Sequence, residues 1–197
     1  GDRLLLILAE RDGQPIAGLA VSARRRLGLR YLTDDRLGEG TVGSFPVAIN
    51  FFVKQIGEPP FWKGPIEQTA RIEGHADRLI KDYDVRTPSR NTAIGQLSGG
   101  NVQKVVLARE LAEGARLVVY NKPTYGLDLA NTLAIRQRIL EAARQGKGVV
   151  VISTDLEELL SLCDRIAVME RGRIAGIVDY GDEARTEVGR LMIGLDA

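Results

Sequence analysis

The stretch Leu97-Ser98-Gly99-Gly100-Asn101 decides the fold prediction for this chain, together with the helix expected to follow it. Ser98 is a favourable N-cap residue, because its hydroxyl can accept a hydrogen bond from an amide of the first helical turn. Gly99 and Gly100 have no Cβ, so a ligand can approach their backbone closely. Open amides at a helix N-terminus, beside a hydroxyl, favour a phosphate. Ser-Gly-Gly alone would instead favour an ordinary capped helix. The apolar positions of the helix, expected to run toward Leu111, are Val102, Val105, Val106 and Leu107.

The residues downstream favour the phosphate-binding interpretation. The helix continues through Gln103-Lys104, and after a short turn comes the apolar run Leu117-Val118-Val119-Tyr120. That run ends in Asn121-Lys122-Pro123-Thr124, and Gly126-Leu127-Asp128 follows. In order and spacing, over about a hundred residues, the chain resembles the ATP-binding cassette ATPases. The first stretch is similar to their signature motif, the second to their Walker B strand, and the third to their D-loop.

Composition limits the classes of protein to consider. The chain has 197 residues, of which 44% are hydrophobic and 27% charged, so we expect a globular domain, or one core with a subdomain. A net charge of +1 gives no reason to expect a nucleic-acid surface. We find no apolar run of membrane-spanning length and no signal peptide. The single cysteine, Cys163, is expected to be a small buried hydrophobe, and the single histidine, His75, to be solvated rather than catalytic or metal-bound.

The first third of the chain is predicted to be mainly strands. The runs 4–9 and 15–20 are expected to be strands joined by a turn, residues 23–26 a solvated basic helix face, and residues 27–32 a further strand. No Gly-Lys precedes Ser or Thr anywhere, so the Walker A loop of the family is missing from these 197 residues. The simplest explanation is that the chain begins after that loop and its helix, and its first residue, a glycine, suggests a trimmed chain. By resemblance, residues 33–43 cover the Q-loop, with Asp34 in place of the usual glutamine.

The middle of the chain is predicted to be helical. Residues 47–54 and 66–83 are expected to form helices around a Pro-rich loop at 58–65. Phe61 and Trp62 are adjacent, so the two are not expected to face one core. The resemblance implies that this helical insert faces membrane subunits. The apolar face of the second helix is predicted to comprise Ile66, Ala70, Ala76, Leu79 and Ile80.

After the D-loop, helices and strands are expected to alternate. We predict a helix at 133–145 ended by Gly146, a buried strand at 148–152, a helix at 156–163, and strands at 165–170 and 173–178. The apolar positions of the first of these helices are Ile135, Ile139, Leu140 and Ala143. This alternation predicts an α/β fold with a parallel sheet. The resemblance implies a P-loop NTPase-like core, with residues 1–45 holding β structure and the Q-loop, 46–112 a helical signature subdomain, and 113–197 the Walker B, D-loop and H-loop.

In the family, ATP lies between two cassettes, with one face on a Walker site and the other on the opposite cassette's signature. Here the Walker B Asp-Glu pair is replaced by Asn121-Lys122, and the H-loop histidine by Thr154. A lysine has no acceptor for a water proton, and its charge repels Mg²⁺. It can instead contact a phosphate or extend into solvent. We therefore expect that this chain can supply its signature to the ATP site of another cassette, while its own Walker site is inactive. Further functional positions of the chain are Asp34 in the Q-loop and Asp128 in the D-loop. The residues expected to contact nucleotide are Leu97, Ser98, Gly99, Gly100, Asn101 and Gln103.

The chain most closely resembles the C-terminal cassette of a tandem-cassette importer ATPase for simple sugars or nucleosides. The resemblance implies ATP and Mg²⁺ shared with an N-terminal cassette, membrane permease subunits as further partners, no nucleic acid, and a place on the cytoplasmic face of the membrane. No residue of this chain is predicted as its own metal site. Alternatives are a DNA-repair or translation cassette, or a degenerate scaffold that binds no nucleotide. The isolated chain is expected to be inactive as an ATPase.

Overall fold

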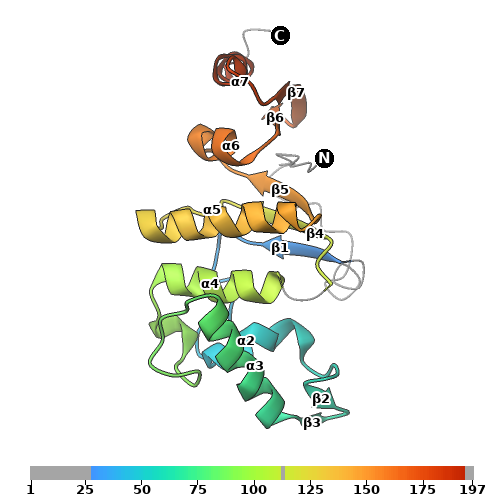
Figure 1. Cartoon of the computed structure of the whole chain (residues 1–197), viewed down its shortest axis with the longest axis vertical. Coiled ribbons are helices and arrows are strands. Elements are labelled where there is room, and N and C mark those ends of the chain that lie inside the picture. Colours follow the sequence, from blue (N-terminus) through green and yellow to red (C-terminus); the bar gives the residue numbers. More distant parts are fainter. Residues whose placement is uncertain (1–27, 112–113, 194–197) are drawn as a thin grey trace. The chain divides into compact units, whose positions relative to one another are not determined.

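The computed structural model describes residues 28–111 and 114–193, which form two compact units (Figure 1). The first unit holds residues 28–31, Gly114–Thr124 and 133–193, and the second holds 32–111 and Tyr125–Thr132. The strands predicted at 4–9 and 15–20, and the basic run at 23–26, lie outside the described residues.

A three-stranded sheet forms the centre of the first unit. Its order is β1 (Leu29–Leu32), β4 (Leu117–Asn121) and β5 (Gly148–Ile152). Strands β4 and β5 are parallel, as predicted, with Leu117 opposite Gly148 and Asn121 opposite Ile152. Helix α5 (Leu129–Arg144) connects them and begins four residues earlier than expected. The buried side chains of these elements are Arg30, Leu32, Val118, Tyr120, Ile135, Ile139, Ala142, Ala143, Val149 and Val151.

The last part of the first unit is a helix, a hairpin and a second helix. Helix α6 (Leu156–Leu162) leads to β6 (Arg165–Glu170) and β7 (Arg173–Asp179), and α7 (Ala184–Met192) follows. Strands β6 and β7 pair antiparallel as a sheet of their own, so the predicted parallel alternation ends at β5 in the described part of the chain. The two-residue loop explains this pairing, because Arg171 and Gly172 both have positive φ, as a type I′ hairpin turn requires.

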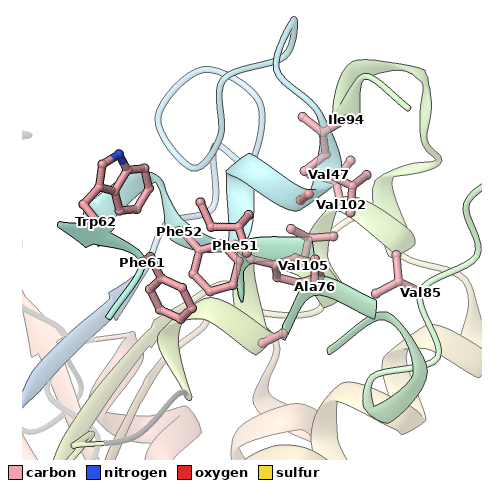
Figure 2. Packing of buried hydrophobic residues seen from close by; sticks show 13 residues of the cluster. Val47, Phe51, Phe52, Phe61, Trp62, Ala76, Val85, Ile94, Val102 and Val105 are labelled. Atoms are coloured by element: carbon pink, nitrogen blue, oxygen red, sulfur yellow. The ribbon is translucent and has the colours of Figure 1, made fainter. Parts of the chain in front are cut away.

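The second unit is built on three helices that pack together: α2 (Val47–Phe52), α3 (Thr69–Asp82) and α4 (Gly99–Glu110). Short 3₁₀ helices lie at Val53–Gln55 and Ile94–Gln96, and a small antiparallel hairpin joins β2 (Trp62–Lys63) to β3 (Ile66–Glu67). Figure 2 shows the core of this unit, in which side chains of α2 meet those of α4 and of the hairpin region.

The structure corrects the predicted boundary of the second helix. It begins at Thr69 rather than Ile66, because Ile66 pairs with Lys63 across a turn at Gly64, whose φ is +59°. Ile66 is consequently 64% exposed, and Ala70 is exposed as well. The residues of α3 that are fully buried are Ile72 and Ala76.

Two predictions about aromatic residues in this unit were wrong. Phe61 and Trp62 are both buried in one cluster, because the chain reverses beside α2 and the Phe61 ring packs 4.2 Å from that of Phe52. His75 is half-buried rather than solvated. Its ring lies edge-on to Phe52 and Phe61, with centroids 5.7 and 5.4 Å away, and its Nδ1 is 2.8 Å from a nitrogen of Arg78. The histidine therefore completes an aromatic contact.

Candidate functional site: the N-terminus of helix α4

Helix α4 begins directly after Ser98, as the sequence predicts. Ser98 has the extended backbone of an N-cap residue, but its hydroxyl makes no hydrogen bond to a backbone amide of the helix, which corrects the predicted capping. The side-chain amide of Asn101 takes that place: its Nδ2 donates to Ser98 Oγ over 2.9 Å. The Oδ1 of Asn101 accepts from the backbone N–H of Arg86 over 2.7 Å, which orients the amide.

This arrangement leaves the Ser98 hydroxyl as a hydrogen-bond donor. A hydroxyl has one proton and two lone pairs, and Asn101 already occupies one lone pair. Ser98 and Gly99 are exposed, so the Ser98 hydroxyl and the backbone of Gly99, the first residue of α4, are accessible. The first turn contains no acidic residue that would repel an anion. These donors fit a phosphate.

The other predicted nucleotide contacts lie deeper. Gly100 is buried, Leu97 is half-buried against the hydrophobic cluster, and Gln103 is 1% exposed. Gln103 therefore presents almost no surface to a ligand, although the sequence places it next to the signature. Within the stretch, Ser98 and Gly99 are exposed, and Leu97 and Asn101 are both half-buried.

Two residues that the sequence analysis did not single out lie at this helix N-terminus. Asn131 packs against Gly100 so closely that a Cβ on Gly100 would be 2.5 Å from Asn131 Nδ2. Arg36 comes from the loop after β1; its NH1 would be 3.1 Å from a Cβ on Gly99, and its NH2 donates to the carbonyl of Tyr125. The sequence did carry a signal for one contact of Asn131. Asp128 is a favourable N-cap for a helix that begins at Leu129, and an N-cap side chain accepts from the backbone N–H three residues later, which belongs to Asn131.

Asp128 is held by Asn131. Its Oδ1 accepts from the backbone N–H of Asn131 over 2.9 Å, and its Oδ2 accepts from Asn131 Nδ2 over 2.6 Å. The backbone N–H, followed by the side-chain amide, lowers the pKa of the Asp128 carboxyl. Asp128 is exposed, so its charge remains accessible to a partner.

The predicted Walker-side residues gather in the first unit, at the C-terminal ends of β4 and β5. Asn121 is the last residue of β4, and its Nδ2 donates to the hydroxyl of Tyr31 over 3.1 Å. Lys122 has a φ of +44°, its N–H donates to the carbonyl of Ile152 over 2.7 Å, and its side chain is half-buried. Thr154 follows β5 and is exposed. Within residues 28–111 and 114–193, no cluster of three His, Cys, Asp or Glu residues is arranged to hold a metal ion.

The comparisons with known proteins agree on one family. The chain is 37% identical over 164 residues to the nucleoside import ATP-binding protein NupA of Lactococcus lactis subsp. cremoris, with 83% of this chain and 32% of that protein covered. It is 36% identical over 185 residues to the glucose import ATP-binding protein TsgD13 of Haloferax volcanii, with 93% and 34% covered. It is 33% identical over 183 residues to the guanosine import ATP-binding protein NupO of Bacillus subtilis, with 93% and 36% covered. The chain thus spans about a third of the length of these curated relatives.

The solved structures show the same fold. A nucleotide-free ATP-binding cassette from an ABC transporter matches with a TM-score of 0.71 at 19% identity, covering 93% of this chain and 75% of that one. A dimeric, post-hydrolysis cassette, MJ0796 with ADP and phosphate, matches with a TM-score of 0.67 at 21% identity, covering 87% and 72%. No family model matches the chain. The chain belongs to the ATP-binding cassette ATPases.

In this ABC ATPase chain, the stretch predicted to be the signature lies at the start of α4, and the stretch predicted to be the D-loop lies just before α5. Both lie in its second unit, whereas Asn121, Lys122 and Thr154 lie in its first. None of the described helices combines the length and apolar character needed to cross a bilayer.

Proposed function

We propose that this chain is a cassette of an ABC importer for sugars or nucleosides, and that its main contribution is to complete an ATP site on a partner cassette. The substrate class comes from the relatives, which are import ATP-binding proteins for nucleosides, guanosine and glucose. The partners are then the N-terminal cassette of the same protein and the permease subunits in the membrane. The chain lies on the inner face of that membrane.

The observation that carries the proposal is the hydrogen bond from Asn101 Nδ2 to the hydroxyl oxygen of Ser98. One lone pair of the Ser98 oxygen accepts from Asn101, so the hydroxyl proton is available to another acceptor. The exposed Gly99, the first residue of α4, lies beside it. A terminal phosphate bears the negative charge that such donors favour, and the helix dipole adds to the attraction by ~0.3–1 kcal/mol. Ser98 and the first-turn amides would therefore contact the γ-phosphate of ATP held on the partner's Walker A loop.

The residues on the Walker side of the chain are less suited to binding Mg²⁺ and hydrolysing ATP. Mg²⁺ prefers oxygen ligands and waters, and the neutral Asn121 already donates to Tyr31. Lys122 offers three donors and no acceptor, so it cannot take a proton from an attacking water. Thr154 can donate to a phosphate, but it has no cationic form near neutral pH, unlike the histidine usual in the family. The proposed role therefore rests on α4 rather than on β4 and β5.

An ATP titration tests the proposal. The chain is mixed with the N-terminal cassette of its protein, and ATP affinity and association of the two cassettes are measured by calorimetry and light scattering. We expect ATP to drive association, ADP not to, and Ser98→Arg to abolish the effect of ATP. Association that is equal with ATP and ADP, or unaffected by Ser98→Arg, would contradict the role in trans. Failure to bind ATP in any mixture would favour the degenerate scaffold.

A further inference from the structure

The segment Tyr125–Thr132, which contains the D-loop, belongs to the same compact unit as the signature helix α4. It leaves the first unit after Thr124 and returns to it at Leu133. Such a grouping needs contacts that hold the segment to its unit. The described residues provide two, one at each end of the segment.

The first contact is made by Asn131. Its amide lies against Gly100, at the place a Cβ would occupy, with Nδ2 at 2.5 Å, Cγ at 2.7 Å and Oδ1 at 3.2 Å from that position. The same Nδ2 donates to Asp128 Oδ2 over 2.6 Å. Asn131 thus contacts the signature and the D-loop carboxylate with one side-chain group. The close approach requires a residue without a Cβ at position 100, and glycine meets that requirement.

The second contact is made by Arg36. Its NH2 donates to the carbonyl of Tyr125, and its NH1 lies near Gly99. The guanidinium is about half-buried, and its buried Nε has no hydrogen-bond partner among the described residues. Because a guanidinium is planar and carries five donors, it can join two backbone segments in a fixed geometry.

We propose that Asn131, supported by Arg36, is a positioning residue that holds the D-loop and the signature together, so that Ser98 and Asp128 meet the partner cassette as one piece. The inference rests on the proposed function, because it assumes that Ser98 acts on a nucleotide of the partner. Neither Asn131 nor Arg36 needs to contact that nucleotide. Each acts through the residues it holds.

A double-mutant cycle on the whole chain tests the contact. Gly100→Ala should lower the melting temperature, because the new Cβ displaces the Asn131 amide and breaks its bond to Asp128. In an Asn131→Ala background, where the obstructing amide is absent, the same change should lower the melting temperature much less. Gly74→Ala is the matched control. It makes the same chemical change on α3, where a Cβ would meet no atom within 4 Å, and its effect should be identical in both backgrounds.

ATP turnover of the complete protein tests the positioning role. Asn131→Ala should lower kcat for ATP by roughly tenfold, since a small displacement of a group that stabilises the transition state is costly. It should leave ADP affinity unchanged, because ADP lacks the phosphate that Ser98 would contact. Asn131→Asp, which keeps the shape but repels Asp128, should lower kcat as well.

The results separate this inference from the proposed function. Additive effects of Gly100→Ala and Asn131→Ala on the melting temperature would overturn the contact, and with it the inference. Unchanged ATP turnover in Asn131→Ala, in a protein that Ser98→Arg inactivates, would also overturn the inference. If Ser98→Arg were harmless and the two substitutions were still coupled, the role in trans would fail and the contact between Asn131 and Gly100 would stand.

Discussion

The side-chain amide of Asn101 donates to the hydroxyl oxygen of Ser98 over 2.9 Å, so this oxygen accepts from Asn101 and keeps its own proton to donate to another group. The usual N-cap bond, in which the hydroxyl accepts from a helix amide, is absent here. The structure gives the asparagine a specific task, which is to keep Ser98 a donor.

Asn101→Asp should impair the signature. An aspartate cannot donate to Ser98, so the serine proton would turn toward the new carboxylate, and a negative charge would lie beside the expected phosphate. We expect ATP turnover of the complete protein to fall by roughly 100-fold, the loss typical when one such donor is removed. Asn101→Gln is the matched control, because it keeps both groups of the amide. Equal turnover in the two variants would show that Asn101 does not orient Ser98.

The 197-residue chain alone should not hydrolyse ATP above background. It contains no Walker A loop, and Lys122 and Thr154 replace the usual carboxylate and histidine. The double variant Asn121→Asp/Lys122→Glu should also be inactive, because phosphoryl transfer depends mostly on positioning and the phosphates have no seat. A phosphate-release assay on clean protein measures both. Turnover by the double variant that requires Mg²⁺ would show that a phosphate-binding loop lies elsewhere in the sequence.

The aromatic cluster of the second unit should be essential to stability. Phe52 is 2% exposed and contacts the rings of Phe61 and His75. Phe52→Ala should lower the free energy of unfolding by about 3–5 kcal/mol, from lost burial and the cavity that remains. Ile66→Ala serves as the control, since Ile66 is 64% exposed and should change stability by less than about 0.5 kcal/mol. Urea unfolding of the two variants makes the comparison. Similar losses would mean that Ile66 is buried after all.

Cys163 should be unreactive in the folded chain. Burial, and then the nearby carboxylates of Asp164 and Glu158, raise the pKa of its thiol to about 12. At pH 8 the folded protein should therefore react with a thiol reagent only as fast as it opens, and urea should restore the ordinary rate. The raised pKa also has a consequence for stability. Above the ordinary thiol pKa of about 8.5, the unfolded chain ionises and the folded chain does not, so stability should fall between about pH 8.5 and pH 12. Rapid labelling of the native protein at pH 8 would contradict the burial of this thiol.

Much of the fold follows from periodicity and local signals. The apolar runs at β4 and β5, the helix after Ser98 and the strands β6 and β7 all lie where the sequence predicts them. What failed depends on contacts between distant residues. Nothing local shows that Phe61 and Trp62 reach one core with Phe52, since that packing follows from a chain reversal beside α2. The pairing of Ile66 with Lys63 is by contrast local, because it follows from the tight turn at Gly64.

The candidate site likewise has parts that local sequence predicts and parts that depend on distant contacts. Ser98, Gly99 and Asn101 were predicted from their order and from the motifs downstream, and the structure places them at the start of α4. The capping bond expected of Ser98 was wrong, because the side chain three residues later competes for the hydroxyl. The contact of Asn131 with Gly100 and that of Arg36 with Tyr125 could not be assigned, since each joins residues far apart along the chain. The buried position of Gln103 likewise depends on how α4 packs against α2 and α3.

The most direct test of the central claim compares two classes of variant in one reconstituted transporter. Ser98→Arg and Gly99→Asp alter the exposed donors of α4, and changes at Asn121 and Lys122 alter the Walker side of the same chain. ATP turnover and solute uptake are measured together for each variant. We predict that the signature variants lose both activities, and that the Asn121 and Lys122 variants retain most of both. Loss of both activities in the Lys122 variant, with full activity in Ser98→Arg, would contradict the account.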